Sequence, residues 1–79
     1  MEPASLPDLT AARCKRGLSL DEIARDTKIR VHYLDAIEHG RFGALPGGVY
    51  NRSYIRQYAR AISYDETKLL AYYCVMGGR

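Results

Sequence analysis

The 79-residue sequence has no tryptophan, only two cysteines, and no cysteine pair at the CxxC spacing. Cys14 and Cys74 lie near opposite ends of the chain, and neither His32 nor His39 stands at a spacing from them that suits a zinc site. A disulfide would require a fold that brings the two cysteines together. We expect instead two small thiols, buried or half-buried, in a reducing compartment. We predict no metal and no cofactor.

The sequence also lacks the motifs of an enzyme and of a membrane-spanning segment. Its glycine-rich stretch at 46–48 (Pro-Gly-Gly) is not followed by the Lys and Ser/Thr of a phosphate-binding loop. No set of nucleophile and base is recognisable, and a helical domain this small rarely encloses a deep pocket. There is no signal peptide and no apolar stretch long enough to cross a bilayer. We therefore predict a non-enzymatic, cytoplasmic domain that binds a macromolecule.

What the sequence does contain is a series of short helical patterns, without the alternation typical of strands. We predict five helices, over about 8–16, 19–27, 30–39, 49–62 and 65–74. Residues 19–22 (Ser-Leu-Asp-Glu) form a capping box, and Asp8 and Asp65 are candidate N-caps. The gap at 27–29 is so short that the second and third helices must cross steeply, which is the helix-turn-helix geometry.

The connection at 41–48 is predicted to be a loop that Phe42 and Leu45 fix to the core. The remaining boundaries are a flexible tail at 1–7, a single domain at 8–76, and a frayed end or the start of a linker at 77–79.

The expected fourth helix carries residue types suited to a protein interface. Two sets recur every four residues along it and predict neighbouring stripes: Arg52, Arg56 and Arg60, and Tyr50, Tyr54 and Tyr58. No acid lies between Glu38 and Asp65, and the net charge of +3 permits an anionic partner. Tyr and Arg are enriched at interface hot spots. Tyrosines at helical spacing can equally belong to the core, and we assign Tyr58 to it; an arginine stripe can equally be a solvated face.

Several segments carry a resemblance to a known family. Residues 16–24 (RGLSLDEIA), with 27–30 (TKIR) and 33–38 (YLDAIE), resemble the helix-turn-helix of phage-repressor type. Residues 42–50 (FGALPGGVY) and 52–60 (RSYIRQYAR) are similar to the cytoplasmic domain of the RodZ family, and the likeness extends over about 9–73. It implies an all-α, five-helix bundle with a repressor-like helix-turn-helix core formed by the second and third helices.

The RodZ resemblance also implies a function. The family has a cytoplasmic domain, a basic linker and one membrane span, and the domain docks the bacterial actin homologue MreB in cell-shape maintenance. Two aromatic positions of the fourth helix are implicated in docking, and they match Tyr50 and Tyr54. We predict that these residues anchor MreB or another acidic protein surface, flanked by Arg52 and Arg56. Any membrane attachment would come from outside this chain. Ser53 and Ser63 stand where the family commonly has glycine.

The alternative is a DNA-binding regulator that uses the third helix. Repressor-type domains read bases from the first turn of this helix and again about one turn later. The corresponding residues for bases and phosphates are Lys28, Arg30, Val31, His32, Ala36 and Arg41. Specific base reading favours Arg, Lys, Asn and Gln, and Asp35 and Glu38 offset the positive charge of this helix. DNA is therefore the weaker prediction. A third reading is a scaffold or dimerisation module with another protein partner.

Overall fold

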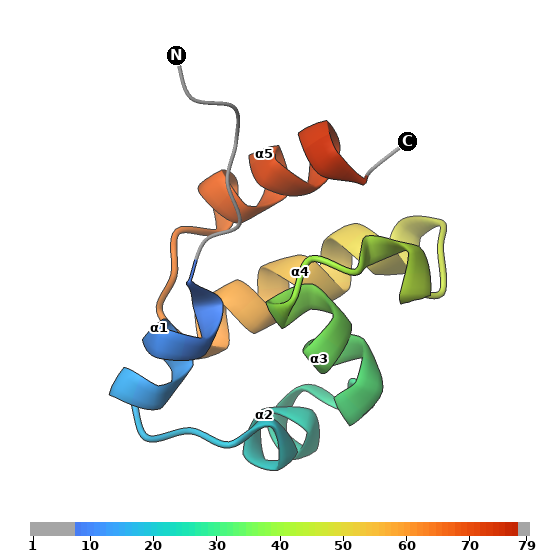
Figure 1. The fold of residues 1–79 in the computed structure, drawn as a ribbon. Helices are drawn as coiled ribbons and strands as arrows, with labels where there is room; N and C mark the ends of the chain where they lie inside the picture. Colours follow the sequence, from blue (N-terminus) through green and yellow to red (C-terminus); the bar gives the residue numbers. More distant parts are fainter. Residues whose placement is uncertain (1–7, 78–79) are drawn as a thin grey trace.

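Five α-helices and one 3-10 helix form the part of the chain that the computed structural model describes, residues 8–77 (Figure 1). The elements are α1 (Leu9–Lys15), α2 (Leu20–Thr27), α3 (Val31–Glu38), η1 (Phe42–Ala44), α4 (Val49–Ala61) and α5 (Glu66–Met76). Residues 8–77 contain no strand, so the all-α prediction is confirmed. The predictions for residues 1–7 and 78–79 lie outside the described residues. Gly77 is the C-cap residue of α5, which extends beyond its predicted end at 74.

The predicted starts of α1, α2 and α5 are confirmed by their side-chain caps. The Asp8 carboxylate accepts a hydrogen bond from the N–H of Ala11 at 3.0 Å. Ser19 and Glu22 form both bonds of the capping box, at 3.1 and 2.8 Å. Asp65 caps α5 in the same way. These bonds satisfy N–H groups that have no partner inside a helix, so local sequence alone sets where these helices begin.

A three-residue turn, 28–30, joins α2 to α3 and produces the predicted helix-turn-helix. Lys28 adopts a left-handed conformation, with φ of 65°, which ends α2. The Thr27 hydroxyl donates to the Ile23 carbonyl at 2.7 Å and accepts from the Ile29 N–H at 3.2 Å. Because Ile29 is buried, the turn is fixed both by hydrogen bonds and by an apolar contact with the core.

The core lies where α4 crosses the other helices, in the middle of Figure 1. Its buried apolar residues come from every element: Leu9, Ile23, Ile29, Leu34, Ala36, Ile37, Phe42, Leu45, Ile55, Tyr58, Ala59, Ile62, Leu69 and Tyr73. Phe42 and Leu45 hold the connection between α3 and α4 on the core, as predicted. The short helix η1 within that connection was not predicted. Its Phe42 ring packs edge-on against Tyr73, with 5.1 Å between ring centroids.

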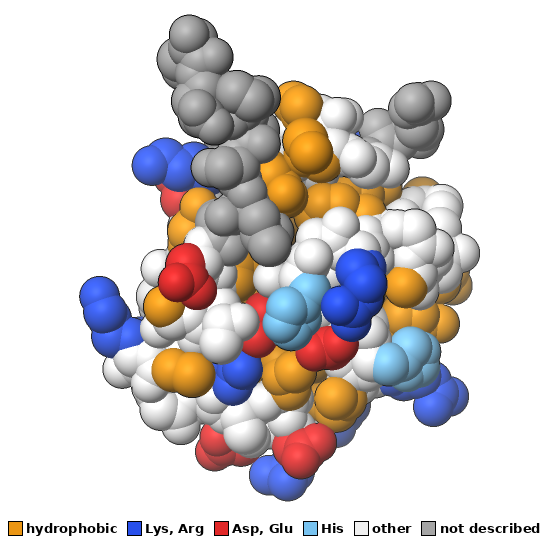
Figure 2. All heavy atoms as spheres, viewed as in Figure 1, with side chains coloured by type: hydrophobic (Ala, Val, Ile, Leu, Met, Phe, Trp, Pro, Cys, Tyr) orange, Lys and Arg blue, Asp and Glu red, His pale blue; other side chains and the backbone are white. Residues whose placement is uncertain are grey.

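The prediction for the two cysteines is wrong, because both thiols are exposed. The helices α1 and α5 lie at the edge of the domain (Figure 1), and α5 packs mainly on α4. Cys14 and Cys74 are on the outward sides of these helices. On α5, Val75 and Met76 are exposed beside Cys74, and Figure 2 shows hydrophobic side chains at the surface over this helix.

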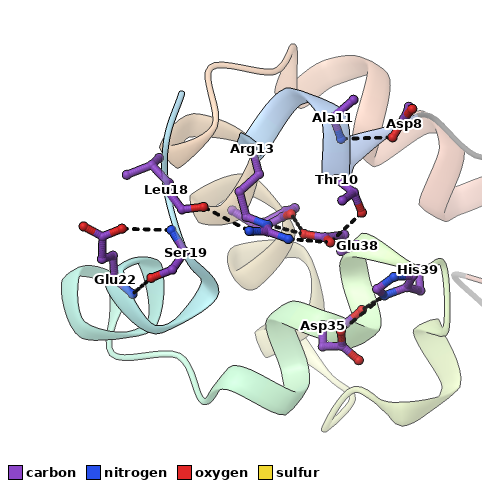
Figure 3. Close-up of polar contacts among 11 residues, drawn as sticks. Asp8, Thr10, Ala11, Arg13, Leu18, Ser19, Glu22, Asp35, Glu38 and His39 are labelled. Carbon is purple, nitrogen blue, oxygen red and sulfur yellow. Dashed lines mark hydrogen bonds and ion pairs between the residues drawn. The ribbon is translucent and has the colours of Figure 1, made fainter. Parts of the chain in front are cut away.

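A buried carboxylate joins three helices. Glu38 of α3 is 3% exposed and accepts hydrogen bonds from Arg13 of α1 at 2.7 and 3.0 Å (Figure 3). It also accepts from the hydroxyls of Thr10 and Tyr58, each at 2.5 Å. Burial acts to raise the pKa of Glu38, but the hydrogen bonds from Arg13, Thr10 and Tyr58 lower it to about 2. Burial, with the bond to Glu38, raises the pKa of Tyr58 well above its usual range.

The lowered pKa of Glu38 predicts a loss of stability in acid. The pKa of a glutamate carboxyl is about 4.3 in an unfolded chain, and that of Glu38 is about 2 in the folded domain. Its contribution is complete above the unfolded value and disappears as the pH falls from about 4.3 towards 2, a loss of roughly 3 kcal/mol. Carboxyl NMR would show Glu38 still ionised at pH 3, and urea denaturation would show the loss. Titration of Glu38 near pH 4 would contradict this prediction.

The end of α4 offers a stabilising substitution. Ser63 has φ of 57°, in the left-handed region that favours glycine. Ser63→Gly should raise the free energy of unfolding by about 0.5–1 kcal/mol, because the strain removed exceeds the backbone entropy added. Ser53→Gly is the matched control: Ser53 lies inside α4, so glycine there should be destabilising by about 0.5 kcal/mol. Urea denaturation measures both, and the same sign for the two variants would contradict this account.

Candidate protein-docking surface

A line of four aromatic rings connects α3 with α4. Its members, called here the aromatic row, are His32, Tyr33, Tyr54 and Tyr50. Successive ring centroids are 4.1, 5.7 and 6.0 Å apart. The row ends at exposed side chains on both sides, since His32 is exposed and Tyr50 is 58% exposed. Tyr33 and Tyr54, in the middle, are half-buried and pack against the core.

The tyrosine stripe of α4 passes from the surface into the core. Each step of four residues rotates a side chain by about 40° around an α-helix. Tyr50 is therefore exposed, Tyr54 is half-buried and Tyr58 is 0% exposed. The assignment of Tyr58 to the core is confirmed. Tyr50 and Tyr54 remain available at the surface, with the Tyr54 ring held between those of Tyr50 and Tyr33.

The arginine stripe lies on the opposite flank of α4, so the prediction of neighbouring stripes is wrong. Residues two apart, such as Tyr50 and Arg52, are separated by about 200° around the helix axis. The Arg52 guanidinium lies 6.0 Å from the ring centroid of Tyr73 on α5. The tyrosines instead face α3, where Tyr54 meets Tyr33. The structure therefore places the four predicted docking residues on two surfaces.

Glu66 of α5 offsets one of the three positive charges of the arginine stripe. Arg60 donates two hydrogen bonds to the Glu66 carboxylate, at 2.8 and 3.1 Å. Arg56 Nε lies 3.8 Å from the same group. These bonds from Arg60 lower the pKa of Glu66. No local pattern in the sequence indicates this pairing, because the acid belongs to the following helix.

The residues predicted for DNA binding fall into two groups. Lys28, Arg30, Val31 and His32 are exposed around the start of α3. Ala36 is 1% exposed, so the prediction that it contacts a base is wrong. One turn after His32, the helix has turned this position into the core. Arg41 is exposed but forms an ion pair with Asp35. The Asp35 Oδ1 also lies 3.3 Å from His39 Nδ1.

The exposed faces carry charges of both signs, and Figure 2 shows acidic and basic side chains interspersed on one of them. Within residues 8–77, Lys28, Arg30 and Arg52 take part in no ion pair. In the same part of the chain, no three His, Cys, Asp or Glu side chains are grouped as a metal site would require. The site can therefore offer aromatic contacts and free cations to a partner.

A family model described as a helix-turn-helix domain matches residues 8–69. Over 65 residues the chain is 40% identical to the cytoskeleton protein RodZ of Streptococcus pneumoniae. This alignment covers 82% of this chain and 24% of that RodZ. Over 52 residues the chain is 42% identical to the uncharacterized membrane protein YmfM of Bacillus subtilis. This alignment covers 66% of this chain and 18% of YmfM. No solved structure matches it.

The chain thus belongs to the helix-turn-helix domain family and, within it, is a domain of the RodZ type. The matched region spans about a quarter or less of the length of these relatives, at 24% and 18%. No helix in residues 8–77 has both the length and the apolar character needed to cross a bilayer.

Proposed function

We propose that this domain is a non-enzymatic adaptor that docks an MreB-type bacterial actin in cell-shape maintenance, through the tyrosines of α4. The observation that carries the proposal is the aromatic row, which ends in Tyr50 at 58% exposure. The 40% identity to a protein named for the cytoskeleton supports it. We further propose that the domain works in the cytoplasm as part of a membrane-attached protein, in keeping with the name of the YmfM relative.

The geometry of the row suits an anchor for a protein partner. A tyrosine offers a large apolar area and a hydroxyl while having few rotatable bonds. Tyr54 is packed between Tyr33 and Tyr50, so its ring is already ordered before binding. Pre-ordered side chains lose little conformational entropy at an interface. Covering Tyr50 would also remove its exposed ring from water.

DNA binding is less well supported. Base reading needs polar side chains in the first turn of the recognition helix and about one turn later. Ala36 is buried, and the charge of Arg41 is offset by Asp35. Only Lys28, Arg30 and His32 remain as exposed polar groups at the start of α3. We therefore expect at most a weak, salt-sensitive attraction to duplex DNA.

Co-sedimentation with polymerised MreB from the same source tests the proposal. The folded chain should pellet with the filaments in a saturable manner and stay in solution without them. In parallel, fluorescence anisotropy with selected and random DNA duplexes over a salt series should show no sequence preference. Failure to pellet with filaments would overturn the docking proposal. Sequence-specific duplex binding in its place would establish the DNA-binding alternative.

A further inference from the structure

The cations that can accompany the aromatic row are not those of α4. The arginine stripe faces α5, where Arg52 lies over the Tyr73 ring and Glu66 pairs with Arg60. A partner that covers Tyr50 meets α4 from the opposite flank. Charges on the far side of the helix act through solvent and are screened over about 8 Å at physiological salt.

At the α3 end of the aromatic row, two exposed cations precede the helix in the chain. Tyr33 donates its N–H to the Arg30 carbonyl at 3.0 Å, so Arg30 lies one helical turn before Tyr33. Lys28 precedes it in the turn between α2 and α3. Both side chains are exposed, and neither is in an ion pair within residues 8–77.

The start of α3 adds to this positive character. Arg30 is the N-cap residue, and no side chain caps the helix there. The first turn of α3 also contains no acidic residue. The N-terminal end of a helix carries a partial positive charge, which favours a negative group nearby. Lys28, Arg30 and the N-terminal end of α3 therefore all attract a negatively charged group.

We infer that the docking surface runs from α4 onto the start of α3, and that acidic groups of the protein partner meet Lys28 and Arg30 rather than Arg52 and Arg56. This inference rests on the proposed docking function and specifies the chemistry of its partner. The partner would offer an apolar recess that accepts Tyr50, and carboxylates placed to face Lys28 and Arg30 when Tyr50 is bound. Lys28 and Arg30, which were considered for DNA, then share one docking surface with Tyr50 and Tyr54.

Two double charge reversals in the co-sedimentation experiment test the inference. Lys28→Glu/Arg30→Glu should weaken filament binding by about tenfold or more and flatten its salt dependence, because like charges would then face each other. Arg52→Glu/Arg56→Glu should stay within about twofold of the unmodified chain, since these residues face away. Lys28→Gln/Arg30→Gln removes the charge without reversing it and should lie between. Circular dichroism would check that each variant is folded.

The outcomes separate this inference from the proposal beneath it. If the unmodified chain does not bind filaments, the docking proposal fails. If it binds through Tyr50 and Tyr54 but the α3 reversal has no effect, only the inference fails. A stronger effect of the α4 reversal, or equal effects of the two reversals, would also overturn it. Loss of binding in the α3 variants alone would establish the extended surface.

Discussion

Replacing Glu38 with alanine should lower the free energy of unfolding by about 3–5 kcal/mol, the usual result of removing one partner of a buried ion pair. The Arg13 guanidinium would lose its counter-ion in a site where its side chain is 16% exposed. The Tyr58 hydroxyl would lose its acceptor inside the core. Helices α1 and α4 would thus lose the group of α3 to which both are hydrogen-bonded.

Such a loss is a large part of the stability of a small domain, which is of order 5–10 kcal/mol. Urea denaturation followed by circular dichroism at pH 7 would measure it. Glu66→Ala is a matched control, because Glu66 also pairs with an arginine but at the surface. We expect the control to change stability by less than about 1 kcal/mol. Equal effects of the two substitutions would show that the Glu38 cluster is no more than a surface pair.

The second large effect concerns binding. Tyr50→Ala/Tyr54→Ala should weaken docking by about thirtyfold or more, since truncating two hot-spot residues removes roughly 2 kcal/mol or more of binding free energy. Both rings belong to the aromatic row, and the exposed end of the row on α4 would disappear with them. Co-sedimentation with MreB filaments over a concentration series gives the change in affinity.

Two controls make the binding result interpretable. Val49→Ala trims a side chain that is 83% exposed on the same helix, and it should leave affinity within about twofold. Tyr50→Ala alone preserves the half-buried Tyr54, so its fold should be intact while its binding is reduced. Binding of the folded double variant at the unmodified level would exclude the tyrosines as anchors.

The part of the fold that the sequence predicted depends on interactions between near neighbours. The capping box at Ser19 and Glu22 acts over three residues, and the same holds for the cap at Asp8. The short turn between α2 and α3 required a steep crossing from length alone. The apolar side chains of Phe42 and Leu45 indicated correctly that the connection between α3 and α4, which contains them, is fixed to the core.

The part that the sequence did not predict depends on which side of a short helix faces inward. Ala36 was expected at the surface, and Cys14 and Cys74 were expected to be at least half-buried, yet the opposite holds in each case. Helices of 7 or 8 residues, such as α1 and α3, contain too few apolar positions to define one inward side. The longer α5, which carries Cys74, has apolar residues on most of its sides, so its pattern does not define an inward side either. Their orientation is set by contacts with other helices.

The polar pairs were missed for a related reason. Glu38 bonds to residues 20 to 28 positions away, so no local pattern indicates it. The charges of Asp35 and Glu38 were counted against DNA binding, although Glu38 is buried and neutralised by Arg13. The wrong prediction of neighbouring tyrosine and arginine stripes was an error of another kind, because helical geometry alone places side chains two residues apart about 200° from each other.

Site-specific photo-crosslinking is the most direct test of the claim that the α3-facing flank of α4 docks a filament. The photoreactive residue p-benzoylphenylalanine would replace Tyr50 in one sample and Arg56, on the opposite flank, in another. After irradiation with MreB filaments, position 50 should yield a product joining the domain to a filament subunit, and position 56 should yield none. A product from position 56 with none from position 50 would contradict the assignment of the docking surface.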